Sequence, residues 1–212
     1  MTELFVSAFV TFFVVIDPPG CAPIFASLTQ GASAAHRRTM AVRSVLIATA
    51  ILLFFALLGE QLLKKLGVSL EAFKIAGGIM LFLIALEMVF EKRQERRSNR
   101  AEEVKKSGEV EDISVFPMGI PMIAGPGSIA SVMLLMARHE GLEATAAILG
   151  ALAANLVLVL LALIAAGPIM RLVGPKIEGM VTRLLGVILA ALAVQFVLDG
   201  IQATLIASPA TS

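Results

Sequence analysis

Apolar residues in this chain come in six long runs, separated by short polar stretches. The runs cover roughly residues 4–29, 41–63, 70–90, 115–137, 143–168 and 182–206. An α-helix rises ~1.5 Å per residue, so about 20 apolar residues cross the ~30 Å hydrocarbon core of a bilayer. Each run is long enough for this, and the pattern predicts an all-α membrane protein with six transmembrane helices.

The composition agrees with residence in a bilayer. Of 212 residues, 58% are hydrophobic and 16% are charged, whereas a soluble domain is about half apolar and about a quarter charged. Cys21 is the single cysteine, so no disulfide can form within the chain. The formal net charge is +1, and no basic patch alternates with aromatic residues. We therefore expect the lipid bilayer as a partner and no nucleic acid.

Charge is concentrated in the segment 92–114, which holds seven Lys/Arg and six Asp/Glu. Such mixed charge is most simply a solvated linker, partly helical through close opposite charges. It divides the chain into units 1–91 and 115–212. If the N-terminus lies outside, thirteen Lys/Arg fall in inner loops and four in outer loops. The positive-inside rule thus predicts a cytoplasmic linker and two outside termini.

The two units share short motifs in the same order. The tripeptide "PPG" at 18–20 returns as "GPG" at 125–127, and "KIAGGI" at 74–79 resembles "RLLGVI" at 183–188. The offsets, 107 and 109 residues, are nearly equal and predict a duplicated three-helix repeat. Because each copy has an odd number of spans, the two copies must be inverted in the membrane, as in many secondary transporters.

Helix-breaking residues interrupt the first and the fourth span. The stretch "DPPGCAP" (17–23) contains three prolines and a glycine, and proline supplies no backbone N–H. We expect the helix to stop near Ile16 and to restart near Pro23. The stretch "FPMGIPMIAGPGSIAS" (116–131) breaks the fourth span at Pro121 and at its Gly-Pro-Gly turn. Irregular backbone at this depth survives only where protein buries it or water reaches it.

Restarting half-helices present unpaired N–H groups and the positive end of a helix dipole, which favour an anion such as a carboxylate. Two of them around a mid-membrane pocket would suit a small zwitterion. Asn155 and Gln195, near the middle of the fifth and sixth spans, could line the pocket. Alternatively, each could hydrogen-bond across a helix interface.

Asp17 is the clear carboxylate at depth. A charge at the centre of a membrane helix costs at least ~2.5–3.5 kcal/mol on insertion scales, so a function is the default hypothesis. Asp17 could hold a substrate ammonium, bind a coupling cation or carry a proton. It could also cap the restarting half-helix through backbone N–H groups. The sequence leaves these roles open.

Catalytic and metal-binding signatures are scarce. The sequence has no G-x-S-x-G, no P-loop, no His/Glu pair at helical metal-ligand spacing and no second deep carboxylate near Asp17. The Gly-Pro-Gly turn alone could cradle a phosphate, but the pattern places no Lys or Arg at that depth. We expect no enzyme activity and no metal or other cofactor, apart from a possible coupling proton or sodium ion.

Four segments together resemble the MarC family, and the likeness covers nearly the whole chain. They are "DPPGCAPIF", "FKIAGGIMLFLIALEM", "PMIAGPGSIA" and "RLLGVILAALAVQFVLDGI". The resemblance implies a six-span protein of the bacterial inner membrane. It also implies kinship with transporters of small neutral amino acids, such as glycine and alanine, within the wider lysine-exporter-like group. Carried onto this sequence, the family's pocket would involve Asp17, Pro18, Gly20, Pro23, Pro121, Gly125, Pro126 and Gly127.

The sequence therefore predicts a secondary transporter of small neutral amino acids, with alternating access between the two repeats. A channel or passive exporter, in which the broken spans line a continuous pore, is the main alternative. An intramembrane enzyme acting on lipid is a weaker one. The small residues Ala146, Gly150 and Ala154 recur every four positions, so they could pack helices within one chain or between two copies.

Overall fold

The computed structural model describes residues 1–106, 112–139 and 141–207. Every regular element in these ranges is helical, so the predicted all-α class is confirmed. The elements are α1 (Thr2–Ile16), α2 (Pro18–Leu28), α3 (Ala34–Lys65), α4 (Leu70–Val89), α5 (Lys92–Lys106), η1 (Ser114–Ile123), α6 (Pro126–Arg138), α7 (Leu142–Ile164) and α8 (Ala166–Ala207).

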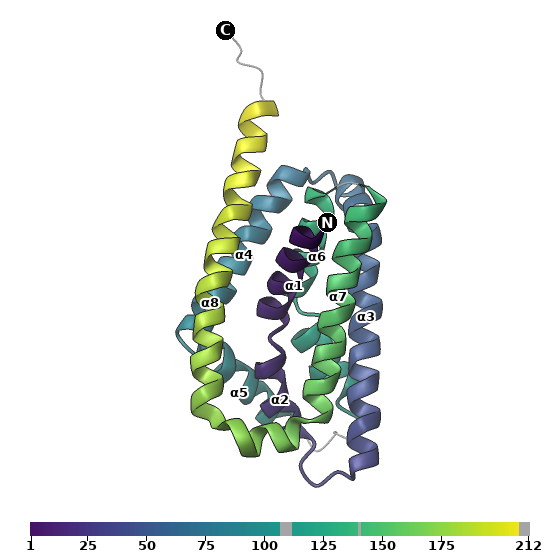
Figure 1. Ribbon diagram of the computed structural model, residues 1–212, viewed down its shortest axis with the longest axis vertical. Coiled ribbons are helices and arrows are strands. Elements are labelled where there is room, and N and C mark those ends of the chain that lie inside the picture. Colours follow the sequence, from purple (N-terminus) through teal and green to yellow (C-terminus); the bar gives the residue numbers. More distant parts are fainter. Residues whose placement is uncertain (107–111, 140, 208–212) are drawn as a thin grey trace.

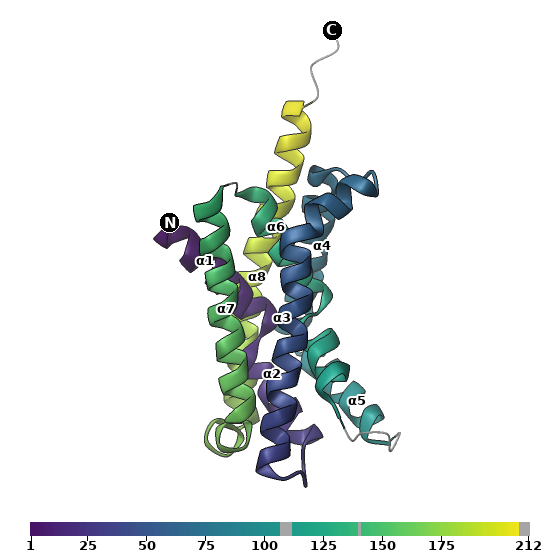
Figure 2. The ribbon, with the colours of Figure 1, turned by 90° about the vertical axis from the view of Figure 1, so that its right-hand side faces the viewer.

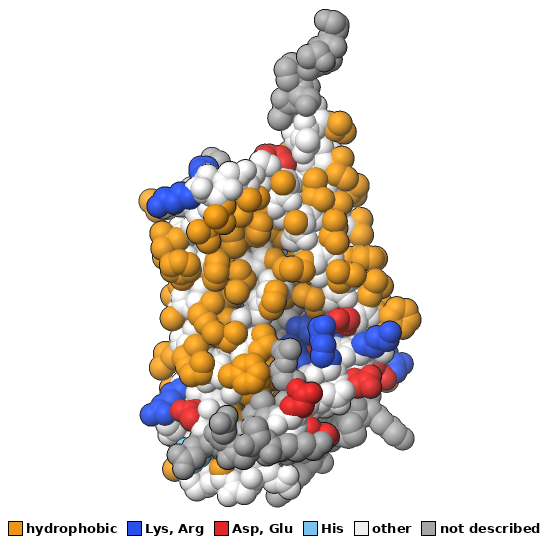
Figure 3. Space-filling model, turned by 180° about the vertical axis from the view of Figure 1, so that it is seen from behind, with side chains coloured by type: hydrophobic (Ala, Val, Ile, Leu, Met, Phe, Trp, Pro, Cys, Tyr) orange, Lys and Arg blue, Asp and Glu red, His pale blue; other side chains and the backbone are white. Residues whose placement is uncertain are grey.

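These elements make six membrane spans, as the hydrophobic pattern predicts. Helices α1 and α2 form one span, and η1 and α6 form another that is bent by 50°. Helices α3, α4, α7 and the Gly179–Leu205 part of α8 complete the set. The start of α1 and the end of α8 lie at the same end of the bundle (Figure 1). A broad hydrophobic band covers the middle of the surface, with charged side chains above and below it (Figure 3).

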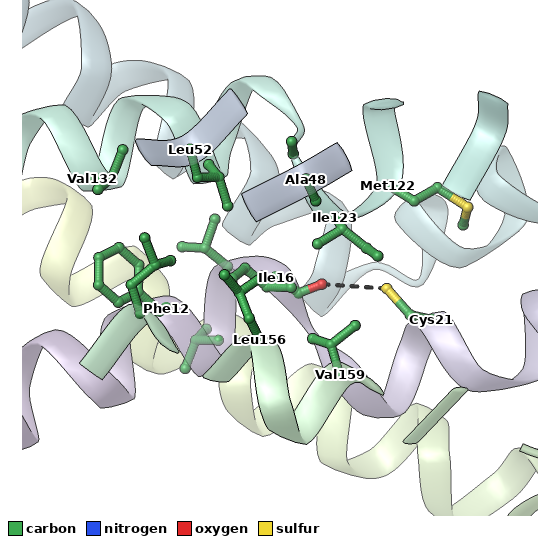
Figure 4. Packing of buried hydrophobic residues seen from close by; sticks show 14 of the residues in the cluster. Phe12, Ile16, Cys21, Ala48, Leu52, Met122, Ile123, Val132, Leu156 and Val159 are labelled. Atoms are coloured by element: carbon green, nitrogen blue, oxygen red, sulfur yellow. Dashed lines mark hydrogen bonds between the residues drawn. The ribbon is translucent and has the colours of Figure 1, made fainter. Parts of the chain in front are cut away.

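The two broken spans cross the centre of the bundle. The first span packs against α7 and the fourth packs against α3. Each broken span thus packs against a helix of the other unit, as expected of two units related by a two-fold axis. Ile16 and Ile123, which directly precede the two breaks, belong to one apolar cluster between α3 and α7 (Figure 4). The two breaks therefore lie close together in the core.

Helices α4 and α8 run side by side and form the largest helix contact. A Cβ atom on Gly78 would lie 2.8 Å from the carbonyl oxygen of Ala193, and one on Gly186 would lie 3.1 Å from that of Ala85. Each glycine thus lets its helix approach the backbone of the other. This reciprocal contact agrees with the predicted repeat, whose boundaries stay a prediction.

The charged segment after α4 is more ordered than its composition indicates. Its first part is α5, which leaves the bundle near the broken spans (Figure 2). Arg93, Arg97 and Ala101 are spaced four residues apart and share one helix face, and Arg93 and Ala101 are buried. Lys92 and Glu95 are exposed. The interpretation of this segment as a solvated linker is therefore wrong for the face that carries Arg93 and Arg97.

Candidate functional site

Asp17 forms the hinge of the first break. Its backbone is left-handed (φ 60°, ψ 66°), so α1 ends and α2 begins at this residue. Its Oδ1 accepts a hydrogen bond of 3.1 Å from the N–H of Gly20. A Cβ atom on Gly20 would lie 2.2 Å from Oδ2 of Asp17, so only glycine leaves room for the carboxylate. Asp17 thus caps α2, one of the roles considered for it.

A cation from α5 reaches the same carboxylate. Nη1 of Arg97 lies 3.1 Å from Oδ2 of Asp17, and the two side chains are 10% and 0% exposed. Nε2 of Gln94, on the same helix, donates to the carbonyl oxygen of Gly20 over 3.3 Å. The sequence pattern placed no Lys or Arg at this depth, and the structure corrects this because α5 folds back onto the broken span.

Arg93 is the second buried cation of α5, at 8% exposure. Its Nη2 donates to the carbonyl oxygen of Val15 over 2.6 Å, and its Nη1 lies 3.0 Å from Sδ of Met88. In a continuous helix, the carbonyl of Val15 would accept from the N–H of residue 19, but Pro19 has none. Arg93 therefore satisfies a carbonyl that the proline-rich break leaves free.

No carboxylate among the described residues forms an ion pair with Arg93. Burial and the neighbouring Arg97 guanidinium lower the pKa of Arg93 to about 9. At that pKa the side chain stays charged at neutral pH.

The second break is built differently. Phe116 and Ile120 have extended backbone inside η1, each directly before a proline, as the ring of the following proline favours. A Cβ atom on Gly125 would lie 2.4 Å from the carbonyl oxygen of Pro121, so the turn requires glycine there. Helix α6 then begins with Gly125 as its N-cap and no side-chain cap. The hydroxyl of Ser128 donates to the carbonyl of Ile123 over 2.8 Å.

Gly127 and Ser128 are buried residues, and their backbone N–H groups have no acceptor among the described residues. The first N–H groups of a helix lack intrahelical partners, so a cap, water or a ligand must satisfy them. The start of α6 is thus an open hydrogen-bonding site.

A cavity of about 280 Å³ lies at this open helix end. It is lined by Val15, Ile84, Arg93, Arg96, Arg97, Pro117, Pro121, Met122, Gly125, Pro126, Gly127 and Ser128. Basic side chains gather at the lower edge of the hydrophobic band (Figure 3). Three guanidinium groups and a helix N-terminus therefore surround one cavity beside the first break.

All four candidates from the second break line this cavity, namely Pro121, Gly125, Pro126 and Gly127. Asp17 adjoins it through Arg97. The other residues of the first break, Pro18, Gly20 and Pro23, form the start of α2 and are not among the lining residues.

The two amide candidates lie elsewhere. Asn155 is fully buried, and its Nδ2 donates to the carbonyl oxygens of Phe9 (3.0 Å) and Ala151 (3.1 Å). It joins α7 to α1, in agreement with the helix-interface interpretation. Gln195 lies on the exposed side of α8 and donates to Oδ1 of Asp199 over 2.7 Å, so it is not part of the cavity.

Sequence reasoning missed the arginines of α5 and Ser128. The sequence contains one signal: Arg93, Arg97 and Ala101 are spaced four residues apart, so a helical segment would carry both arginines and the small alanine on one face. A second lies in the first break, where Pro19 leaves a deep carbonyl without its usual donor. Such a carbonyl needs a donor from another part of the chain.

Comparison with known proteins decides the family. Residues 2–205 match the MarC family, described as integral membrane proteins. The chain belongs to the MarC family. The resemblance seen in the sequence is thereby confirmed.

MarC-family relatives with similar sequences occur in archaea and bacteria. A UPF0056 membrane protein of Methanocaldococcus jannaschii is 38% identical over 204 residues, covering 96% of this chain and 98% of the relative. The UPF0056 membrane protein YvbG of Bacillus subtilis is 37% identical over 202 residues, covering 95% and 96%. One from Archaeoglobus fulgidus is 37% identical over 207 residues, covering 96% and 95%. No solved structure matches the chain.

Proposed function

We propose that this MarC-family protein is a secondary transporter of small neutral amino acids, of the glycine or alanine type, and not an enzyme. The observation that carries the proposal is the cavity at the uncapped start of α6, beside a second broken span. Broken spans that meet inside the membrane are a recurring substrate-site design of secondary transporters. At about 280 Å³, the cavity is slightly smaller than the ~300–1,000 Å³ pockets of drug-sized ligands, which suits a small metabolite.

In this proposal the substrate carboxylate binds at the N–H groups of Gly127 and Ser128, where the helix dipole favours negative charge. Asp17 is engaged by Arg97 and Gly20 in this conformation. We therefore assign the substrate ammonium to backbone carbonyls of the broken spans.

In this proposal the protein lies in the plasma membrane. The positive-inside rule favours an orientation with α5 on the cytoplasmic side and both termini outside. Access to the cavity would then alternate as one repeat moves against the other. A proton or sodium gradient would drive the cycle.

The test is uptake of labelled glycine and alanine by proteoliposomes that contain the purified protein, under imposed proton or sodium gradients. We expect saturable, gradient-stimulated uptake that is accelerated by unlabelled substrate on the opposite side. Flux that saturates poorly and shows no such acceleration would instead indicate a channel. If folded wild-type protein moves neither substrate, the neutral amino acid assignment is wrong.

A further inference from the structure

The charges around the cavity do not balance within the described residues. Arg97 pairs with Asp17 and Arg96 pairs with Glu87. Arg93 lines the same cavity, is more deeply buried than Arg96, and has only a carbonyl oxygen and a sulfur as partners. Three guanidinium groups thus face two carboxylates. Buried charges in proteins are normally paired, so the cavity has room for one more negative charge.

The two breaks show where that charge would lie. Asp17 is the N-cap of α2, and the residue that holds this place in α6 is Gly125. The 107-residue offset that aligns "PPG" with "GPG" sets Ala124, the residue before that cap, opposite Asp17. In the first break a carboxylate lies between a helix N-terminus and an arginine. In the second break there is also a helix N-terminus beside arginines, but neither Ala124 nor the N-cap Gly125 brings a carboxylate.

We propose that the cavity is an oxyanion site that the ligand completes. The N–H groups of Gly127 and Ser128 and the guanidinium of Arg93 bind a carboxylate or phosphate group. This group takes the place that the Asp17 carboxylate holds in the first break. Charge balance makes the site prefer a net anion over a zwitterion, and a zwitterion over a cation.

Two sources can supply such a group: a small soluble anion or the phosphate of an anionic lipid, since basic pockets between membrane helices also bind lipid headgroups. The inference rests on the proposed function in one respect: both place the ligand in this cavity. Binding of an anion there does not require that the protein transports amino acids. Equilibrium binding and flux are measured separately, so one can fail while the other stands.

Cys21 gives a convenient measure of binding. It is the only cysteine and is fully buried, so a thiol-reactive fluorophore reports its exposure as the protein melts. The protein would be held in nanodiscs of phosphatidylcholine alone. Inorganic phosphate or acetate would replace chloride at constant ionic strength, with glycine and methylammonium as the zwitterionic and cationic comparisons. A ligand that binds only the folded state raises the melting temperature in proportion to the logarithm of its concentration.

We expect phosphate and acetate to raise the melting temperature of the wild type more than glycine does, and methylammonium to have no effect. Arg93→Gln should weaken anion binding at least tenfold, while Arg93→Lys, which keeps the charge, should retain most of it. Lys92→Gln is the matched control, because Lys92 is exposed on the same helix, and it should bind as the wild type does. If Arg93→Gln fails to fold, Arg96→Gln takes its place in the test. Arg96 lines the same cavity at a more exposed position, and its loss should also weaken anion binding.

A second arm adds phosphatidylglycerol to the nanodiscs, first without free phosphate and then with it. Stabilisation that depends on Arg93 or Arg96 and that blocks the effect of phosphate would identify a lipid headgroup as the ligand. Absence of this effect, together with arginine-dependent stabilisation by free anions, would identify a soluble one. The inference is wrong if no anion stabilises the wild type in either arm, or if the arginine variants respond as the wild type does.

Discussion

Both broken spans place the start of a half-helix beside arginines, but they differ in whether a side chain caps that start. In the first, the fully buried Asp17 ends one half-helix, caps the next and pairs with Arg97. In the second, Gly125 begins the half-helix without a side-chain cap, and a cavity lies against it. One break carries its own anion, whereas the other leaves the same position open.

This difference assigns separate tasks to the two halves. A buried, paired carboxylate fixes the geometry of the first break and holds α5 in place. An uncapped helix end with a nearby uncompensated arginine is suited to exchange a ligand, because none of the described residues places a competing carboxylate there. We therefore regard the first break as the support of the site and the second as its binding half.

The largest expected effect comes from breaking the first half. Asp17→Asn removes the partner of Arg97 and leaves that cation buried, which typically costs about 3–5 kcal/mol of folding stability. We expect a large fall in the melting temperature, measured by labelling of Cys21. The double variant Asp17→Asn with Arg97→Gln should recover part of the loss, because it removes the unpaired charge. An Asp17→Asn protein as stable as the wild type would show that the pair does not support the fold.

A smaller effect is expected from crowding the second half. Gly125→Ala places a methyl group 2.4 Å from the Pro121 carbonyl oxygen, and overpacking of this kind costs about 1–3 kcal/mol. The turn should shift, and amino acid uptake and anion binding should both fall. Gly150→Ala is the control, because its methyl group would meet only the ring of Phe5 at 3.7 Å. Equal behaviour of the two variants would contradict the requirement for glycine at position 125.

The smallest effect concerns Asp112, which precedes the second broken span. The hydroxyl of Ser114 donates to its carboxylate and Arg43 pairs with it, so the pKa of Asp112 lies below its ordinary value despite partial burial. A lowered pKa in the folded state gives stability that is present above the unfolded value of ~3.9 and is lost as the pH falls through the folded value.

The pair with Arg43 is largely exposed, and such pairs contribute about 0–1 kcal/mol. The wild type should thus melt slightly above Asp112→Asn at pH 7, and the difference should shrink when the pH falls below about 4. A difference that grows in acid would contradict this account.

Much of the fold could be predicted because it depends on local chemistry. Six apolar runs of sufficient length predict six spans, and the prolines near Asp17 and Pro121 predict the two breaks. The capping role of Asp17 was among the roles considered, because a carboxylate at the start of a half-helix has a nearby N–H to accept from.

The missed contacts depend on how distant segments pack. Nothing local indicates that Arg97 reaches a residue 80 positions earlier in the chain, and charge density alone predicts a solvated segment. Predicted depth in the membrane makes Gln195 a candidate, but depth does not reveal which face of α8 the residue occupies. The same argument from predicted depth selects Asn155, but its contacts with α1 depend on how the helices pack.

The central claim is that a ligand supplies to the second break what Asp17 supplies to the first. Its most direct test is Ala124→Asp, which adds a carboxylate to the chain at the residue directly before the N-cap of α6, with Ala124→Asn as the uncharged control. Melting curves of both variants and of the wild type would be recorded with increasing phosphate or acetate in phosphatidylcholine nanodiscs. The account predicts that Ala124→Asp folds and no longer responds to either anion, while Ala124→Asn still does. An Ala124→Asp protein that anions stabilise as strongly as the wild type would contradict it.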